Sequence, residues 1–225
     1  MTEALHDVAT LEEVDRDGAV REAAEAVRGD TRAALLRKGG LLAGAVAVSF
    51  VALPKGFALA QGTSASDVKI LNYALTLEYL EAAFYAEANQ KGKLDGITAR
   101  FAQVVGAHEA AHVSALKQAL GSKATKTPSF DFKGTTADEG TFLSTAMALE
   151  DTGVAAYQGQ APLIKSTQVL GSAGAILAVE ARHAAWVRDI IGAGKKPVPA
   201  PEAFNTPMTM DQVLAAVKKT GFIKS

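Results

Sequence analysis

Hydrophobic positions in the middle of the chain follow the spacing of amphipathic helices. From Ser66 to Gln90 the chain contains no glycine or proline, and apolar residues such as Ile70, Leu77 and Phe84 recur at helical spacing. Residues three or four positions apart share one face of a helix, so this pattern predicts a helix over 66–90. The same reasoning predicts further helices over about 98–120, 138–161 and 167–191.

The connections between these helices differ in length, and the difference predicts their topology. The first and third connections are short, so each adjacent pair of helices should form an antiparallel hairpin. Residues 121–137 form a longer, turn-rich connection that could span more than about 50 Å. A helix of about 24 residues is only about 36 Å long. The chain is therefore predicted to be all-α, a four-helix bundle of two antiparallel hairpins with one long crossover.

The first 60 residues are predicted to be an export signal. Residues 1–38 are polar, and the run from Gly39 to Leu53 carries no charge. A small-x-small sequence follows at 58–60, as at sites cut by signal peptidase. The uncharged run is shorter than the roughly 20 residues of a membrane span. No stable membrane anchor is therefore expected after cleavage, and an uncleaved anchor is the alternative.

The segment Thr31 to Lys38 resembles the twin-arginine export signal, with Ala33 in place of the second arginine. Export by this or another route predicts a periplasmic, extracellular or cell-envelope protein. Residues 61–192 are then the bundle. Residues 193–225 are a proline-rich extension with a short amphipathic helix over 210–219.

Composition and charge exclude several classes of chemistry. The 225 residues include no cysteine, which rules out disulfides, thiolate-bound iron–sulfur centres and a cysteine nucleophile. Lysine and arginine (23) nearly balance aspartate and glutamate (24). Since the chain also lacks a basic cluster, nucleic acid is not an expected partner.

A set of acidic residues and histidines is repeated in the two predicted hairpins. In each hairpin one helix carries a glutamate followed seven residues later by a tyrosine, and the other carries a Glu-x-x-His unit. The glutamate precedes that unit by 31 residues in the first hairpin and by 30 in the second. This spacing indicates an internal duplication. The residues are Glu78, Tyr85, Glu109 and His112 in the first hairpin, and Glu150, Tyr157, Glu180 and His183 in the second.

The helical spacing places the glutamates and histidines of this repeat inside the bundle, on the apolar faces. Four buried carboxylates would be very costly alone, because each loses its hydration and repels the others. Two divalent cations would remove most of that cost. Carboxylates with one imidazole per metal suit iron or manganese. Glu109 and Glu180 are the expected bridges between the metals, and Glu78 and Glu150 are the expected ligands of one metal each.

The repeat resembles the ligand set of the ferritin-like di-metal carboxylate proteins. Leu71 to Glu78, followed by Tyr79 and Tyr85, is similar to the first helix of bacterioferritin-type and desiccation-related ferritin-like proteins. The resemblance covers about residues 66–192. It implies two iron ions, with manganese as the alternative, and a reaction that oxidises Fe(II) or reduces dioxygen or peroxide in oxidative or desiccation stress. Tyr85 and Tyr157 are then the expected redox or hydrogen-bonding neighbours of the metals.

Several interpretations remain open from the sequence. Glu81, His108 and Asp151 neighbour the ligands in sequence. Glu81 could be a further ligand, but a solvated or supporting role is the expectation for it and for Asp151. His108 is expected to be a surface histidine or one whose hydrogen bonds are satisfied. A bundle that serves as a stress or envelope scaffold with a vestigial metal site is the alternative function. Iron storage would need a hollow cage, and the sequence leaves a homo-oligomer open.

Overall fold

The computed structural model describes residues 63–192, 195 and 198–224. The predicted export signal, residues 1–60, lies outside the described residues. Among the described helices, none combines the length and apolar character that a membrane crossing requires.

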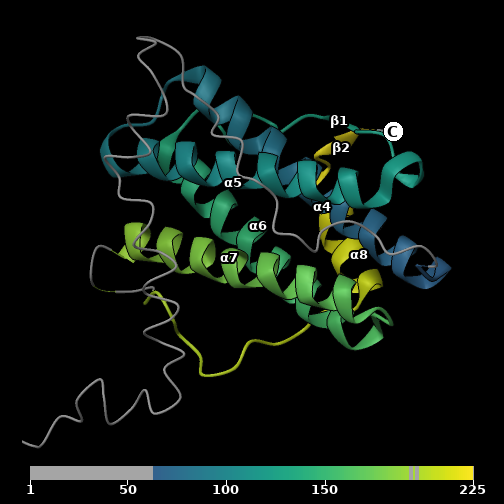
Figure 1. Ribbon diagram of the computed structural model, residues 1–225. Helices are drawn as coiled ribbons and strands as arrows, with labels where there is room; N and C mark the ends of the chain where they lie inside the picture. The colour runs from purple at the N-terminus through teal and green to yellow at the C-terminus, as the bar shows by residue number, and fades with distance from the viewer. Residues whose placement is uncertain (1–62, 193–194, 196–197, 225) are drawn as a thin grey trace, which may run out of the picture. The chain divides into compact units, whose positions relative to one another are not determined.

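Four long helices form the bundle, and the all-α prediction is confirmed (Figure 1). Each helix begins and ends within two residues of its predicted range. Short 3-10 turns follow the second and third of them. The helices are α4 (Ala65–Lys91), α5 (Gly96–Leu120), α6 (Glu139–Gln160) and α7 (Thr167–Gly192).

Polar side chains and glycine set the helix ends. The Ser64 side chain accepts a hydrogen bond from the backbone N–H of Asp67 at the start of α4, and Asp138 caps α6 in the same way. These bonds satisfy N–H groups that have no partner within the helix. Helix α4 is followed by Gly92, whose φ of 59° lies in the left-handed region that glycine adopts without strain.

The direction of the helices follows from contacts across the bundle. The α4–α5 and α6–α7 pairs pack as hairpins. Tyr157 of α6 contacts Glu78 of α4, whereas the earlier Glu150 contacts the later Tyr85. Helices α4 and α6 are therefore antiparallel, which makes α5 and α6 parallel. The connector between α5 and α6 must consequently return along the length of the bundle.

The connector runs along α4, as the predicted crossover requires. Near the start of α4, the Asn72 side chain donates to the Lys123 carbonyl (3.0 Å) and accepts from the Thr125 N–H (2.6 Å). Near the end of α4, the Thr136 hydroxyl donates to Glu87 (2.5 Å). The connector thus passes from one end of α4 to the other.

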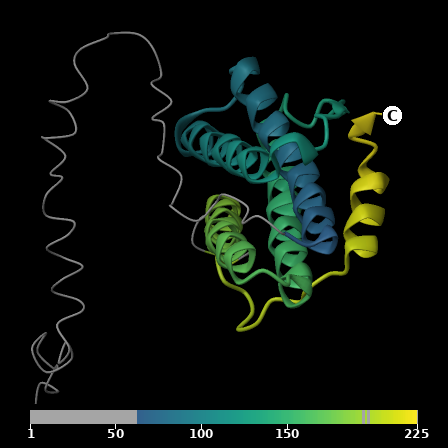
Figure 2. The ribbon, with the colours of Figure 1, turned by 45° about the vertical axis from the view of Figure 1, so that its right-hand side comes forward.

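The end of the chain packs on the outside of the bundle (Figure 2). Helix α8 (Met210–Thr220) contacts α6 and buries Val213 and Val217. Beyond it, β2 (Ile223–Lys224) pairs antiparallel with β1 (Ser129–Phe130) of the connector. Helix α8 was predicted within one residue of its observed end, and the two short strands were not predicted.

The core consists of two apolar clusters with polar residues between them. In α5, Phe101 and Val105 belong to the first cluster and Leu116 to the second, and Glu109 and His112 lie between them in sequence. The first cluster includes an aromatic group in which the rings of Phe84 and Phe142 stack with centroids 5.2 Å apart. Apolar side chains therefore flank the polar layer along α5.

Candidate metal centre

The structure brings the six predicted ligands together in this polar layer. The four glutamates are fully buried, and 2% of the His183 surface is exposed. The His112 side chain is 12% exposed. Their ligand atoms form two overlapping groups, within each of which all atoms lie within 4.8 Å of one another. The groups are Glu78, Glu109, His112 and Glu180, and Glu109, Glu150, Glu180 and His183.

Glu109 and Glu180 belong to both groups, whereas Glu78 and Glu150 belong to one each. A carboxylate shared by two groups can place one oxygen toward each of two cations. This is the distribution that the sequence predicts for bridging and terminal ligands. Their role as metal ligands stays a prediction.

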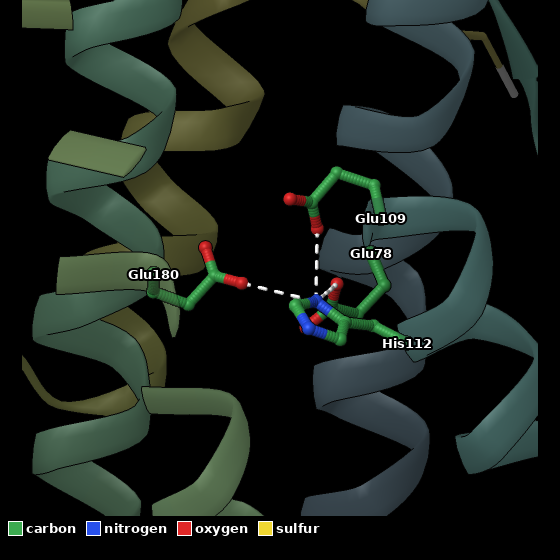
Figure 3. A group of neighbouring side chains, drawn as sticks. All are labelled: Glu78, Glu109, His112 and Glu180. Carbon is green, nitrogen blue, oxygen red and sulfur yellow. Dashed lines mark hydrogen bonds and ion pairs between the residues drawn. The ribbon is translucent and has the colours of Figure 1, made fainter. Parts of the chain in front are cut away.

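The first group surrounds the imidazole of His112 (Figure 3). Its Nδ1 lies 3.1 Å from Glu109 Oε2, 3.2 Å from Glu78 Oε2 and 3.1 Å from Glu180 Oε1. Helices α4, α5 and α7 each supply one of these carboxylates. Three helices therefore converge on one ring nitrogen.

The second group surrounds His183 of α7 in a related way. Its Nδ1 lies 3.0 Å from Glu109 Oε1 and 3.2 Å from Glu150 Oε2. Glu109 therefore directs one oxygen toward His112 and the other toward His183. The two histidine rings have centroids 6.3 Å apart.

Several buried polar atoms in this cluster have no well-directed hydrogen bond, although the distances between them are short. Such atoms are costly to bury unless a cation or another partner satisfies them. In the described part of the chain, the ion pairs of these carboxylates involve only His112 and His183. The atoms are Glu109 Oε1, Glu150 Oε2, both carboxylate oxygens of Glu180, and His183 Nδ1.

The spacing of these atoms fits a metal ion. Ligand atoms about 2.1 Å from one cation and at right angles to each other lie about 3.0 Å apart. The nitrogen–oxygen distances of 3.0–3.2 Å agree with this value. The cluster can therefore hold a metal ion, and its oxygen and imidazole ligands suit a first-row transition metal.

Two tyrosines connect the hairpins at the ligands, as their matching positions in the repeat suggest. Tyr157 of α6 donates its hydroxyl hydrogen to Glu78 Oε1 on α4 at 2.5 Å. Tyr85 of α4 donates to Glu150 Oε1 on α6. Burial, together with the partner carboxylate, raises the pKa of each tyrosine well above its ordinary value. Both hydroxyls therefore stay protonated and act as donors.

Burial also raises the pKa of the two carboxyl groups that both ligand groups share. It raises the pKa of Glu109 from 4.5 to about 7. It raises the pKa of Glu180 well above the ordinary value, and the neighbouring charges of Glu109 and Glu78 add to the effect. Burial alone would lower the pKa of His183, but the close carboxylates of Glu109 and Glu150 raise it to about 10. The metal-free site therefore retains protons at neutral pH.

The stability of the metal-free protein is expected to fall as pH rises from 5 to 8. When folding raises the pKa of a carboxyl group, its contribution to stability is fully present at pH values below the pKa in the unfolded chain. That contribution is lost as the pH rises through the pKa in the folded protein. For Glu109 the loss occurs between pH 4.5 and about pH 7, and it lowers the free energy of unfolding by an amount on the order of 3 kcal/mol. The raised pKa of His183 acts in the same direction up to about 10.

Urea unfolding of metal-free protein across this pH range measures the effect. Metal ions should reverse the trend, because ligands must release protons to bind. A metal-free stability that rises steadily from pH 5 to pH 8 would contradict the raised carboxyl pKa values.

Glu81 is buried in the cluster, which excludes the solvated role and leaves the supporting role, or that of a further ligand, that the sequence also offered. It is only 3% exposed. A Cβ placed on Gly153 would lie 3.3 Å from Glu81 Oε1 and 3.1 Å from Glu180 Oε2. Gly153 stands three residues after Glu150, as Glu81 stands after Glu78. The absence of a side chain at 153 therefore leaves room for the Glu81 carboxyl. Burial and the charge of Glu180 raise the pKa of Glu81 well above its ordinary value.

His108 and Asp151 also have specific partners that the sequence did not identify. His108 is exposed, but its Nδ1 lies 2.9 Å from His183 Nε2. Asp151 of α6 forms an ion pair with Arg188 of α7. The i, i+3 spacing from Glu78 was a signal for Glu81. No local signal pairs His108 with a residue 75 positions away.

Comparison with known proteins gives one family match. A family model described as a ferritin-like domain matches residues 66–193, which is more than half of the 225 residues. No curated protein matches the chain. The matched range begins one residue after the start of α4 and ends one residue after the end of α7.

Proposed function

This chain belongs to the ferritin-like domain family, and we propose that its four-helix bundle binds two metal ions, which we expect to be iron. Manganese is the alternative metal. The proposed reaction is oxidation of Fe(II) or reduction of dioxygen or peroxide, in defence against oxidative or desiccation stress. The observation that carries the proposal is the pair of overlapping, buried carboxylate–histidine groups that share Glu109 and Glu180.

The chain's own residues supply the metal ligands for this chemistry and an apolar surrounding. Glu109 and Glu180 would bridge the two positions, and each histidine would complete one of them. Bound iron or manganese supplies one-electron redox chemistry. The apolar clusters on both sides limit the access of water, which strengthens electrostatic interactions inside the site.

The tyrosine hydroxyls hold the terminal carboxylates in fixed orientations. Each donates to one oxygen of a glutamate on the opposite hairpin. The other oxygen of that glutamate lies at the metal-ligand cluster, with Glu78 Oε2 near His112 and Glu150 Oε2 near His183. Hydrogen-bonded partners of this kind orient ligands and tune the metal.

Anaerobic titration with Fe(II) tests the proposal. The protein should bind two Fe(II) per chain, and later exposure to dioxygen or peroxide should produce an absorbance change with protein-bound Fe(III). Binding of no metal would contradict the proposal. It would instead favour the scaffold alternative, for which a variant lacking all six ligands should still protect in a desiccation assay.

Replacing either tyrosine is expected to weaken metal binding without removing it. Tyr85→Phe and Tyr157→Phe each delete one hydroxyl donor to a buried carboxylate, so metal affinity should fall about tenfold or more. The stoichiometry of two ions should persist. Tyr79→Phe is the matched control, because the Tyr79 hydroxyl donates to the Thr125 carbonyl at 3.4 Å, outside the cluster. Equal affinities for all three variants in competition titrations with a chelator would contradict the orienting role.

We also propose that the protein acts outside the cytoplasm. The support is the uncharged run from 39 to 53 and the small-x-small sequence at 58–60. Cell fractionation and N-terminal sequencing of the native protein test this. A full-length chain found only in the cytoplasm would contradict it.

A further inference from the structure

His108 forms a direct extension of the candidate metal centre toward solvent. Its ring lies nearly parallel to the ring of His183, with centroids 5.1 Å apart and planes inclined by 16°. The Nδ1 of His108 lies 2.9 Å from the Nε2 of His183. His108 is exposed, whereas His183 is buried. A hydrogen bond between imidazoles therefore connects the buried ring to the protein surface.

The two nitrogens of His183 face opposite environments. Its Nδ1 lies 3.0–3.2 Å from carboxylate oxygens of Glu109 and Glu150, so Nδ1 is the atom available to a metal. A metal-bound nitrogen carries no proton, and a neutral imidazole then has its proton on Nε2. That Nε2–H is directed to His108 Nδ1, which must accept it. The proton of a neutral His108 would then lie on its own Nε2.

The second hairpin has no equivalent of this histidine. In the internal repeat, Glu109 corresponds to Glu180, so position 108 corresponds to Val179. A valine can neither donate nor accept a hydrogen bond through its side chain. His112 therefore cannot receive from position 179 the support that His183 receives from His108. The duplicated site is chemically asymmetric at this point.

We propose that His108 is a positioning residue that fixes the orientation and the Nε2–H tautomer of His183, and thereby makes the two metal positions unequal. The metal position at His183 is the better organised one and binds the first ion. This inference rests on the proposed function, because it requires that His183 bind a metal. Histidines that bind a metal commonly donate the N–H of their other ring nitrogen to a fixed acceptor, and removal of that acceptor lowers metal affinity about 10–100-fold.

Two substitutions at 108 separate hydrogen bonding from packing. His108→Leu removes the acceptor and retains an apolar side chain of comparable size. His108→Asn keeps an acceptor oxygen on Cγ, near the place of the imidazole Nδ1. Val179→Ala is the control at the corresponding position of the other hairpin. Position 108 is exposed, so the variants should fold, and thermal unfolding of the metal-free proteins checks this.

Competition titration with Mn(II) and a chelator should resolve two affinities in the wild-type protein. In His108→Leu the tighter affinity should fall about 10–100-fold, and the weaker one should change little. His108→Asn should recover most of the loss, and Val179→Ala should match the wild type.

Nitrogen NMR of the Zn(II)-loaded protein provides a second readout that a packing defect would not change. The wild-type protein should show metal-bound Nδ1 and protonated Nε2 for His183, with an Nε2–H protected from exchange with water. His108→Leu should lose that protection, and His108→Asn should retain it.

The outcomes distinguish this inference from the proposed function. If the wild-type protein binds neither Mn(II) nor Zn(II) at the cluster, the proposed function fails. If the wild type binds two ions and His108→Leu binds both with unchanged affinities and exchange protection, only the role of His108 is overturned. Equal losses in the Leu and Asn variants would also overturn it, since a hydrogen-bond acceptor would then not be the relevant feature.

Discussion

The double variant Glu109→Gln/Glu180→Gln is expected to lose metal binding and yet to unfold at a higher temperature than metal-free wild-type protein at pH 7.5. Both glutamates belong to both ligand groups, so the change removes a shared ligand from each position. Both are fully buried, and burial raises the pKa of each. A neutral amide of nearly the same shape removes charge repulsion and part of the desolvation cost.

The size of the stabilisation follows from the raised pKa values. A carboxyl whose pKa rises from 4.5 to about 7 is destabilising by up to about 3 kcal/mol near neutral pH. The amides lose some hydrogen bonds, so a net gain of about 1–3 kcal/mol is expected. This corresponds to roughly 2–10 °C in unfolding temperature.

Calorimetry of metal-free proteins and metal analysis of loaded proteins measure the two effects. Glu202→Gln is the control, because Glu202 is exposed and lies outside the bundle. This change should alter neither the unfolding temperature nor the metal content. A double variant that still binds two ions, or one that is much less stable than the metal-free wild type, would show that these carboxylates serve the fold and not a metal site.

Metal addition is expected to produce the largest change in stability of the wild-type protein. A ligand that binds only the folded state at 100 times its dissociation constant adds about 2.7 kcal/mol per site. Two sites would add about 5 kcal/mol, or roughly 10–20 °C. Anaerobic Fe(II) or Mn(II) should therefore raise the unfolding temperature strongly, and a chelator should reverse the rise.

The specificity of this shift separates a built site from general binding of cations to acidic groups. Mg²⁺ prefers oxygen ligands and usually retains several waters, so it should stabilise much less. The Glu109→Gln/Glu180→Gln variant should show no rise with Fe(II) or Mn(II). An equal rise in that variant would contradict binding at the cluster.

The bundle was predictable because its determinants are local. Helical spacing of apolar residues located all four long helices, and the lengths of the connections indicated the crossover. The strands β1 and β2 contain two residues each, which is too short for a periodic pattern. Their pairing of Ser129 with Lys224 depends on where α8 docks, and no local sequence feature encodes that contact.

The residues of the candidate site that belong to the internal sequence repeat could be predicted. The duplicated glutamate and Glu-x-x-His spacing identified six residues that the structure brings together. The burial of Glu81 and the partner of His108 were not predicted, because neither residue follows the repeat: the corresponding positions hold Gly153 and Val179. Their environments depend on contacts between helices distant in sequence, such as that of His108 with His183.

A crystal structure of the protein loaded anaerobically with Mn(II), with anomalous diffraction data, tests the two-metal site most directly. We expect two anomalous peaks per chain between the four helices, one beside His112 and one beside His183, with Glu109 and Glu180 contacting both. Diffraction that shows no peak in the polar layer, with manganese only at surface acidic residues such as Asp131, would contradict the two-metal site.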